Sequence, residues 1–220
     1  AASQAEAQAK VIHTIHGLPF HPYQSGPANF LYRAAERFAA RRCHRIVSVA
    51  DAMTDQAVAA GIAPREKFVT VYSGMKLEPF LDDSRDRHAL RARWGFGKED
   101  LVLGKIARLF ELKGHEYLLE AYAGLAAERP RLRLLLVGDG IWRERFERQV
   151  RQFGLEKRVV FAGLVPHDEV ADAIAAMDVV VHCSLREGLA RVLPQALLSA
   201  KPLVSFDVDG LDPAACPNTG

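Results

Sequence analysis

A glutamate and a glutamine follow one of the most apolar stretches of the chain. Glu187 and Gly188 come directly after VVVHCSLR, and seven residues separate Glu187 from Gln195, which lies on the next predicted helix. A carboxylate beside a glycine, where the backbone can be approached closely, suits the hydroxyl groups of a sugar. Taken alone, a capping acid and a surface glutamine explain the pair slightly better.

Two cations, Arg108 and Lys113, follow another apolar run, LVLGKIA, and precede Gly114 and a predicted helix start. Arginine binds phosphate oxygens with two N–H groups, lysine adds a mobile charge, and a helix N-terminus offers free N–H groups. Together these features suit a phosphate group. Two solvated surface cations are an equally good explanation of this pair by itself.

Both pairs belong to a regular alternation of strands and helices. Near-continuous Val/Leu runs separated by helices are typical of a parallel sheet covered on both faces. Ligands bind at the carboxyl ends of such strands, which is where both pairs lie. We therefore predict a doubly wound α/β domain with a ligand site at this edge. The predicted strands are residues 101–109, 131–138, 159–164, 178–184 and 202–208, and the predicted helices are 114–128, 142–154, a short one from Asp168, and 191–200.

The first part of the chain repeats this rhythm more briefly and predicts a separate α/β unit. Between the two units, the charged segment LDDSRDRHALRARW lacks an apolar stripe and places the boundary near residues 76–85. We divide the chain into residues 1–80 and 81–220, and expect a loop in the Pro- and Gly-rich last residues. The strands predicted for the first unit are 10–17, 44–50 and 67–74, and its helices are 28–42 and 51–60.

Composition excludes several classes of protein. The chain has 220 residues, 49% hydrophobic and 25% charged, and its net charge of +2 gives no general electrostatic case for nucleic acid. Cys43, Cys183 and Cys216 are widely spaced and form no Cys-x-x-Cys, so neither a disulfide framework nor a zinc site is supported. A reducing compartment fits better, and no apolar run approaches the roughly 20 residues of a membrane span.

Several short motifs occur together in one order. RLFELKG, VGDG, FAGLV and REGLARVLPQAL, preceded by TIHG and VYSGM, resemble glycosyltransferase family four over roughly residues 10–208. This family has a Rossmann-like GT-B fold, so the resemblance implies part of an acceptor-side N-terminal domain and most of a donor-binding C-terminal domain. We expect the chain to be a fragment that is truncated at both ends and inactive alone.

The resemblance implies a role for each matching residue. Arg108 and Lys113 would bind the donor diphosphate, and Glu187 would hold the donor sugar hydroxyls. Backbone N–H groups of Gly188 and Leu189 would lie near the phosphate or sugar.

The remaining implied contacts concern the base, the ribose and the sugar. Main-chain groups around Leu164 would meet the base, and Gln195 replaces the family's second glutamate, which binds the ribose. An amide loses the charge-assisted hydrogen bond that a carboxylate makes. His16 matches a histidine beside the donor sugar and is, with Glu187, a candidate catalytic residue. His13 suits a structural role better.

No metal or other cofactor is expected, because enzymes of this class need none. Asp207 and Asp209 form an Asp-x-Asp pair, a motif that binds metal in other glycosyltransferases. Here the pair follows the fifth strand of a different fold, which argues against a metal role.

The predicted function is a retaining glycosyltransferase that uses a nucleoside diphosphate sugar and an unidentified acceptor, which could be a glycan, a lipid or a small molecule. A non-catalytic nucleotide-binding module and a GT-B nucleotide-sugar epimerase are the alternatives. Arg33, Arg37 and Arg41 recur at four-residue spacing on one predicted helix and suit an anionic membrane, although a solvated face is the commoner explanation. We expect a cytoplasmic protein, with peripheral attachment to the inner membrane face as an open alternative.

Overall fold

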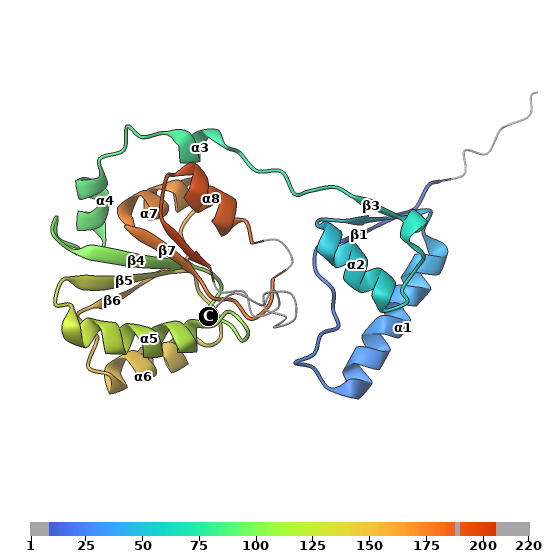
Figure 1. Cartoon of the computed structure of the whole chain (residues 1–220), viewed down its shortest axis with the longest axis horizontal. Helices are drawn as coiled ribbons and strands as arrows, with labels where there is room; N and C mark the ends of the chain where they lie inside the picture. Colours follow the sequence, from blue (N-terminus) through green and yellow to red (C-terminus); the bar gives the residue numbers. More distant parts are fainter. Residues whose placement is uncertain (1–8, 188–189, 206–220) are drawn as a thin grey trace, which may run out of the picture. The chain divides into compact units, whose positions relative to one another are not determined.

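A computed structural model describes residues 9–187 and 190–205. Gly188, Leu189, the Asp207/Asp209 pair and the Pro- and Gly-rich last residues lie outside this part. By their contacts, the described residues form two compact units (Figure 1). The first unit comprises the chain up to Met75 together with Glu187, and the second unit comprises Lys76–Arg186 and the chain from Ala190 onward.

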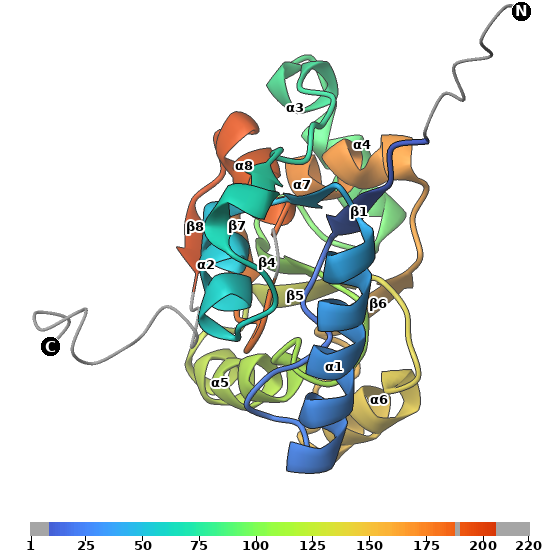
Figure 2. The same ribbon diagram turned by 90° about the vertical axis from the view of Figure 1, so that its right-hand side faces the viewer.

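The first unit contains a three-stranded parallel sheet in the order β1-β2-β3. Two helices accompany it: α1, with a proline in its first turn, and the shorter α2 (Figure 2). All five elements lie where the sequence predicts them. Their bounds are β1 Ile12–Ile15, α1 Gly26–Arg42, β2 Arg45–Ser48, α2 Asp51–Ala59 and β3 Phe68–Thr70.

The two faces of this sheet differ in exposure. Ile15, Ile46 and Phe68 are buried in a single apolar cluster with residues of α1 and α2. Ile12 and Val69, which point to the opposite face because side chains alternate along a strand, are exposed. Within the described residues, the core of the first unit is therefore built on one face of its sheet.

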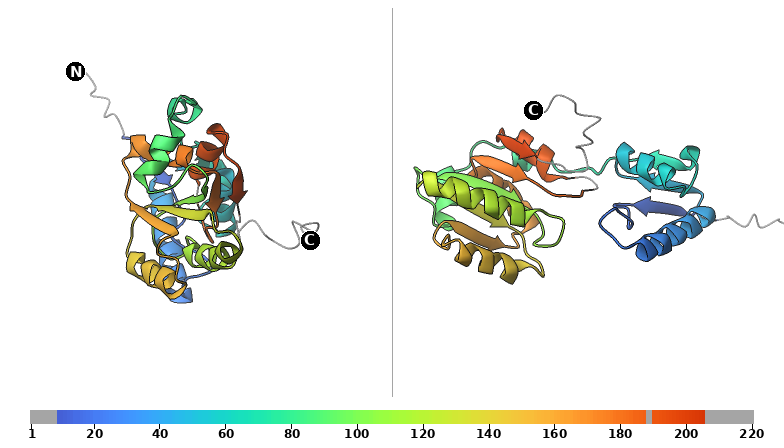
Figure 3. Two further views of the ribbon diagram at one scale, coloured as in Figure 1. Left: turned by 90° about the vertical axis from the view of Figure 1, so that its left-hand side faces the viewer. Right: turned by 60° about the horizontal axis from the view of Figure 1, so that its bottom comes forward.

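The second unit contains five parallel strands in the order β6-β5-β4-β7-β8. Helices α5 and α6 cover one face, and α7 and α8, with the short α3 and α4, cover the other (Figures 1 and 3). The predicted α/β class with parallel sheets is confirmed. The strands are β4 Leu101–Ile106, β5 Leu132–Val137, β6 Val159–Gly163, β7 Val179–His182 and β8 Leu203–Ser205; the helices are α3 Glu78–Leu81, α4 Arg87–Arg93, α5 His115–Glu128, α6 Arg143–Gln152, α7 Val170–Ala176 and α8 Val192–Leu198.

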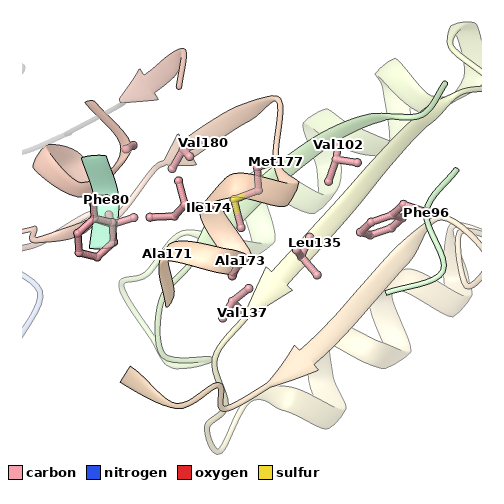
Figure 4. Packing of buried hydrophobic residues seen from close by; sticks show 12 residues of the cluster. Phe80, Phe96, Val102, Leu135, Val137, Ala171, Ala173, Ile174, Met177 and Val180 are labelled. Atoms are coloured by element: carbon pink, nitrogen blue, oxygen red, sulfur yellow. The ribbon is translucent and has the colours of Figure 1, made fainter. Parts of the chain in front are cut away.

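Strand β5 shows why its sequence is a continuous apolar run. Leu134 and Leu136 pack into the cluster formed with α5 and α6. Leu135 and Val137 point the other way, into the cluster formed with α7 and α8 (Figure 4). All four side chains are buried, because a central strand of a doubly covered sheet has no solvent face.

Helix α4 lies within the charged segment that has no apolar stripe. Asp86 caps it by accepting hydrogen bonds from the backbone N–H groups of His88 and Ala89. Arg91 is buried and its Nη2 binds Asp178, the residue just before β7. Apolar periodicity does not detect a helix that is held by polar contacts, and the N-cap aspartate was the signal available in the sequence.

Asp178 links three parts of the second unit. Its Oδ1 accepts from Arg87 Nη2 at 2.5 Å, and its Oδ2 accepts from Arg91 Nη2 and from the backbone N–H of Val102. Burial raises the pKa of Asp178, but the Val102 N–H and the two guanidinium groups outweigh it, so the net pKa lies below the usual value. The carboxylate therefore stabilises the fold in its charged form.

Replacing Asp178 by asparagine is expected to lower the free energy of unfolding by about 2 kcal/mol at neutral pH, because hydrogen bonds to a charged group are lost. A depressed native pKa contributes stability above the ordinary value of 3.8 and loses it as the pH falls through the native pKa. The difference between wild type and Asp178→Asn should thus shrink below about pH 4. Urea unfolding at several pH values checks this, with exposed Asp83→Asn as control. A difference that stays constant with pH would contradict it.

Candidate functional site

The strand order of the second unit creates one topological switch point. The chain leaves β4 on one side to build β5 and β6, and returns on the other side at β7. The crevice outside the carboxyl ends of β4 and β7 is where such sheets bind ligands. Arg108 and Lys113 lie in the loop after β4, and Glu187 lies in the loop after β7. We call these the β4–α5 loop and the β7–α8 loop.

The β4–α5 loop carries its two cations on a strained backbone. Arg108 is exposed, with its guanidinium 5.3 Å from the centre of the Phe110 ring, and Lys113 is half-buried. Leu112 between them has φ of 65°, a left-handed conformation that is unfavourable for leucine. Its carbonyl accepts a hydrogen bond of 2.8 Å from the N–H of Leu185. This bond joins the β4–α5 loop to the β7–α8 loop, and strain of this kind is often retained at functional sites.

Gly114 makes a second junction between the same two loops. Its φ is 69°, and a Cβ at this position would overlap the backbone carbonyl oxygen of Cys183. In return, Cys183 Sγ donates to the carbonyl oxygen of Gly114 at 3.2 Å. Only a residue without a side chain permits this approach. The sequence identified Gly114 as a helix start and did not reveal its contact with β7.

The first residue of α5, His115, is buried beside the site. Its ring lies 5.1 Å from the ring of Phe146, and neither ring nitrogen has a hydrogen-bond partner in the described part of the chain. Burial, with the charges of Lys105 and Lys113, lowers its pKa to about 3. His115 is therefore neutral at physiological pH and adds no charge to this end of the helix.

Further polar side chains lie buried under the crevice. Lys105, on β4, has its Nζ 3.4 Å from Cys183 Sγ, and His182 and Ser184 flank that cysteine. Ser184 Oγ has no partner among the residues that the structure describes. None of these residues was predicted as part of the site. The signal was a charged or polar residue interrupting two apolar runs, LVLGKIA and VVVHCS.

The VGDG turn after β5 supports the β4–α5 loop from the other side. A Cβ on Gly138 would overlap the carbonyl oxygen of Ala107, and one on Gly140 would overlap that of Leu109. The Leu109 N–H donates to the carbonyl of Asp139 at 3.0 Å. Ordinary loop geometry is therefore an incomplete explanation of this turn, because it positions the loop that carries Arg108.

The other predicted site residues have different surroundings. Leu164, after β6, is 77% exposed, whereas Gln195, on α8, is only 6% exposed. His16 is exposed at the end of β1 in the first unit. His13 lies against Glu36 on α1, with 2.9 Å between Nε2 and Oε2, a contact within the first unit that suits a structural role.

The structure thus joins the loops of Arg108, Lys113 and Glu187 and places Gln195 below the surface. Within residues 9–187 and 190–205, no group of three His, Cys, Asp or Glu side chains could hold a metal ion. The predicted Asp-x-Asp pair lies beyond these residues, and the expectation that no metal is needed stays a prediction.

Comparison with known families gives two matches that cover most of the chain. Residues 86–219 match the model described as glycosyl transferases group 1, and residues 1–74 match a glycosyl transferase 4-like domain.

Two curated relatives act on the same small molecule according to their names. The 2-deoxystreptamine glucosyltransferase of Streptomyces kanamyceticus is 30% identical over 82% of this chain and 47% of its own length. The 2-deoxystreptamine N-acetyl-D-glucosaminyltransferase of Streptomyces fradiae is 32% identical over 82% of this chain and 43% of its own length. The chain therefore spans about half the length of these relatives.

Solved structures resemble the chain closely. Anabaena HepE in complex with UDP-glucose superposes with a TM-score of 0.77 at 27% identity, over 89% of this chain and 53% of that one. WaaG, a glycosyltransferase of lipopolysaccharide biosynthesis, has a TM-score of 0.77 at 19% identity, over 94% of this chain and 59% of its own, a likeness of fold alone.

Proposed function

Since the chain belongs to the glycosyl transferases of group 1, we propose that it moves a sugar from a nucleoside diphosphate sugar to an acceptor with retention of anomeric configuration. The GT-B fold implied by the sequence motifs is confirmed by the solved neighbours. Because the relatives are about twice as long, activity is proposed for the protein to which these two units belong.

The observation that carries this proposal is the junction of the β4–α5 loop with the β7–α8 loop. The Leu185–Leu112 hydrogen bond and the Gly114–Cys183 approach hold the loop of the two cations against the chain that leaves β7, two residues before Glu187. Cations suit a diphosphate, and a carboxylate suits sugar hydroxyls. The HepE structure holds UDP-glucose, which supports a UDP-sugar as the donor.

Each group has a distinct task in the proposed reaction. Arg108 and Lys113 neutralise the leaving diphosphate, where negative charge grows in the transition state, together with the N-terminus of α5. Glu187 holds the hydroxyls of the donor sugar while the anomeric carbon of that sugar becomes oxocarbenium-like. The bond from the anomeric carbon to the diphosphate oxygen breaks, and the acceptor oxygen bonds to that carbon from the face that the diphosphate leaves. The proton of the acceptor hydroxyl passes to the departing diphosphate oxygen, and the role that the resemblance implies for His16 is to orient the sugar.

The nucleoside contacts complete the proposed site. The Gln195 amide takes the ribose hydroxyls and the main chain near Leu164 takes the base. The burial of Gln195 requires that the ribose reach below the surface of α8.

Calorimetric binding of UDP-, GDP- and ADP-glucose to the 220-residue chain tests the donor assignment. We expect tightest binding for the UDP-sugar. Glu187→Ala should weaken UDP-sugar binding about tenfold or more while leaving UDP itself nearly unchanged, because Glu187 touches the sugar and a hydrogen bond to a charged group is lost. Exposed Glu156→Ala is the matched control. Equal losses for both ligands would refute the role of Glu187.

Product analysis with the donor separates the alternatives. An epimerase releases free epimerised donor without any acceptor. A non-catalytic module binds the nucleotide and transfers nothing. Transfer to an added acceptor with a retained anomer supports the proposal.

Helix α1 supports a second proposal, peripheral contact with an anionic membrane. Phe30, Leu31 and Phe38 are 73%, 66% and 57% exposed on it, beside the exposed Arg33 and Arg41. An exposed face that combines aromatic, aliphatic and cationic side chains suits a lipid interface.

Arg37 lies between Arg33 and Arg41 along this helix, but its guanidinium is bound within the first unit. Its Nε donates to the carbonyl of Gly61 and its Nη2 to that of Ala60, so it fastens α1 to the end of α2. Within the described residues, no helix is long and apolar enough to cross a bilayer.

Sedimentation with phosphatidylcholine vesicles, with and without phosphatidylglycerol, tests the membrane contact. Binding should need the anionic lipid and should fall severalfold in Leu31→Ser and Phe38→Ser, because each removes buried apolar area in the bound state. Phe153→Ser, on an exposed phenylalanine after α6, should have no effect. If Leu31→Ser, Phe38→Ser and Phe153→Ser sediment equally, the contact is ruled out. It is also ruled out if the wild type does not sediment with vesicles that contain phosphatidylglycerol.

A further inference from the structure

A cavity of about 280 Å³ lies in the second unit at the edge opposite the crevice. Its walls come from the segment between Phe80 and Arg87, from α7, and from the end of α8 with Lys201. Lys201 comes just before β8 and Arg87 binds the turn just before β7, so the cavity faces the amino ends of these strands. We propose that it is a binding site for a small oxyanion, a phosphate or carboxylate group, held by Lys201 and Arg87.

Two cationic side chains converge on one neutral oxygen in this wall. Lys201 Nζ and Arg87 Nε donate to the same carbonyl oxygen, that of Ala175, at 3.0 and 3.2 Å. An ammonium has three N–H donors, and this carbonyl takes one of them. The two positive charges repel each other at this distance. An anion bound between them would attract both and offset that repulsion.

The carboxylates around the cavity are already engaged, with one exception at its rim. Asp178 is shared by Arg87 and Arg91, and Arg85 binds Asp172 and Asp82. The exception, Asp83, is exposed. In the described part of the chain, no carboxylate oxygen lies within 4.0 Å of Lys201 Nζ. Lys201 is thus the cation of this group that an added anion would pair.

The charge of Lys201 is costly where it lies. Burial first, and then the charges of Arg87 and Arg91, lower the pKa of Lys201 to about 8, while Asp178 acts in the opposite direction. A bound anion favours the ammonium form, so binding should raise this pKa and should be stronger below pH 8. This behaviour follows from the positions of the groups around the cavity.

The backbone next to Lys201 is strained. Ala200 has φ of 50°, in the left-handed region that favours glycine. Helix α8 ends here in a turn with two hydrogen bonds. The Ala200 N–H donates to the Leu197 carbonyl, and the Lys201 N–H donates to the Ala196 carbonyl. This turn is what places Lys201 in the cavity wall.

The occupant would act on the segment that follows the first unit. Asp82, Asp83 and Arg85, which precede α4, form part of the cavity wall. An anion on Lys201 and Arg87 would therefore tie this segment more firmly to α7 and α8. The proposal is independent of sugar transfer, because the cavity and the crevice lie at opposite edges of one sheet.

Competitive labelling with acetic anhydride, read by mass spectrometry of individual peptides, tests the site in the wild-type chain. Without added anion, Lys201 should titrate near pH 8. Inorganic phosphate or acetate, against sodium chloride at equal ionic strength, should raise the midpoint of Lys201 by about one unit and slow its labelling near pH 8 several-fold. Lys157 should not respond.

The peptide readout separates this site from the crevice, which also attracts phosphate. A response to phosphate alone identifies a phosphate site, and a response to acetate alone identifies a carboxylate site. Unchanged labelling of Lys201 with both anions would overturn the proposal. So would a Lys201 midpoint at the ordinary lysine value of 10.5 without added anion.

A variant gives a second, independent readout. Lys201→Met should fold at least as stably as the wild type without anion, because it removes a half-buried cation. Its melting temperature should rise less with phosphate than that of the matched control Lys157→Met, since both variants keep the crevice. Equal rises would overturn the proposal. UDP binding by Lys201→Met should match the wild type, so failure here is distinguishable from failure of the donor site.

Discussion

Gly114→Ala is expected to lower the free energy of unfolding by about 3 kcal/mol and to abolish binding of the donor nucleotide. The added methyl group would overlap the carbonyl oxygen of Cys183, and alanine is unfavourable at a φ of 69°. Overpacking costs about 1–3 kcal/mol and the left-handed backbone about 1–2 kcal/mol. The β4–α5 loop would have to move away from β7, and Lys113 would move with it.

Gly124, on helix α5, provides the control. A Cβ there meets no atom within 4 Å, so Gly124→Ala should stabilise the protein by about 0.5–1 kcal/mol and leave nucleotide binding intact. Chemical unfolding and calorimetry with UDP check both variants. Wild-type UDP affinity in Gly114→Ala would mean that the junction of the two loops does not shape the site.

Removing either cation of the β4–α5 loop is expected to reduce sugar transfer by about 100- to 1,000-fold, the usual effect of deleting a group that stabilises transition-state charge. Arg108 and Lys113 lie five positions apart in the loop between β4 and α5. Both should act on one diphosphate. Their effects should therefore be coupled, and the double variant should lose less than the two single losses combined.

Arg108→Lys should recover little of the lost turnover, because an ammonium cannot make the planar two-pronged contact of a guanidinium. Arg151→Ala, on an exposed residue of α6, should keep wild-type rates. Initial rates with a fixed UDP-sugar, measured in a protein that carries these two units and transfers sugar, decide the matter. Full turnover in Arg108→Ala and Lys113→Ala would leave these cations as a solvated surface and remove the main support for the proposed reaction.

The parallel sheet of the second unit was predictable because strands that are buried on both faces have continuous apolar sequences. Leu134, Leu135, Leu136 and Val137 form an unbroken apolar run since each must enter one of two cores. The edge that bears Arg108 followed from the rule that ligands bind at the carboxyl ends of such strands. Helix α4 has no apolar pattern in its sequence, because its buried residue, Arg91, is held by ionic contacts.

The details of the site depend on residues far apart in the chain. No local pattern indicates that Gly114 meets the backbone of Cys183, or that Lys105 approaches the same cysteine. The burial of Gln195 likewise comes from packing of α8, since Gln195 by itself reads as a surface residue. Sequence could therefore name the two loops, but the contacts that join them appear only when β7 is placed beside β4.

That placement also dictates when the site can come into existence during folding. Strand β4 pairs with β5 through Leu101 and Leu132, and β5 pairs with β6 through Leu134 and Val159, all within short stretches of chain. The β4–β7 pairing joins Leu103 to Val179 and closes a much longer loop. Closing longer loops costs more entropy and slows folding. On a ribosome, the β4–β5–β6 half can form while β7 is still being synthesised, and the crevice is completed only by the last central strand to arrive.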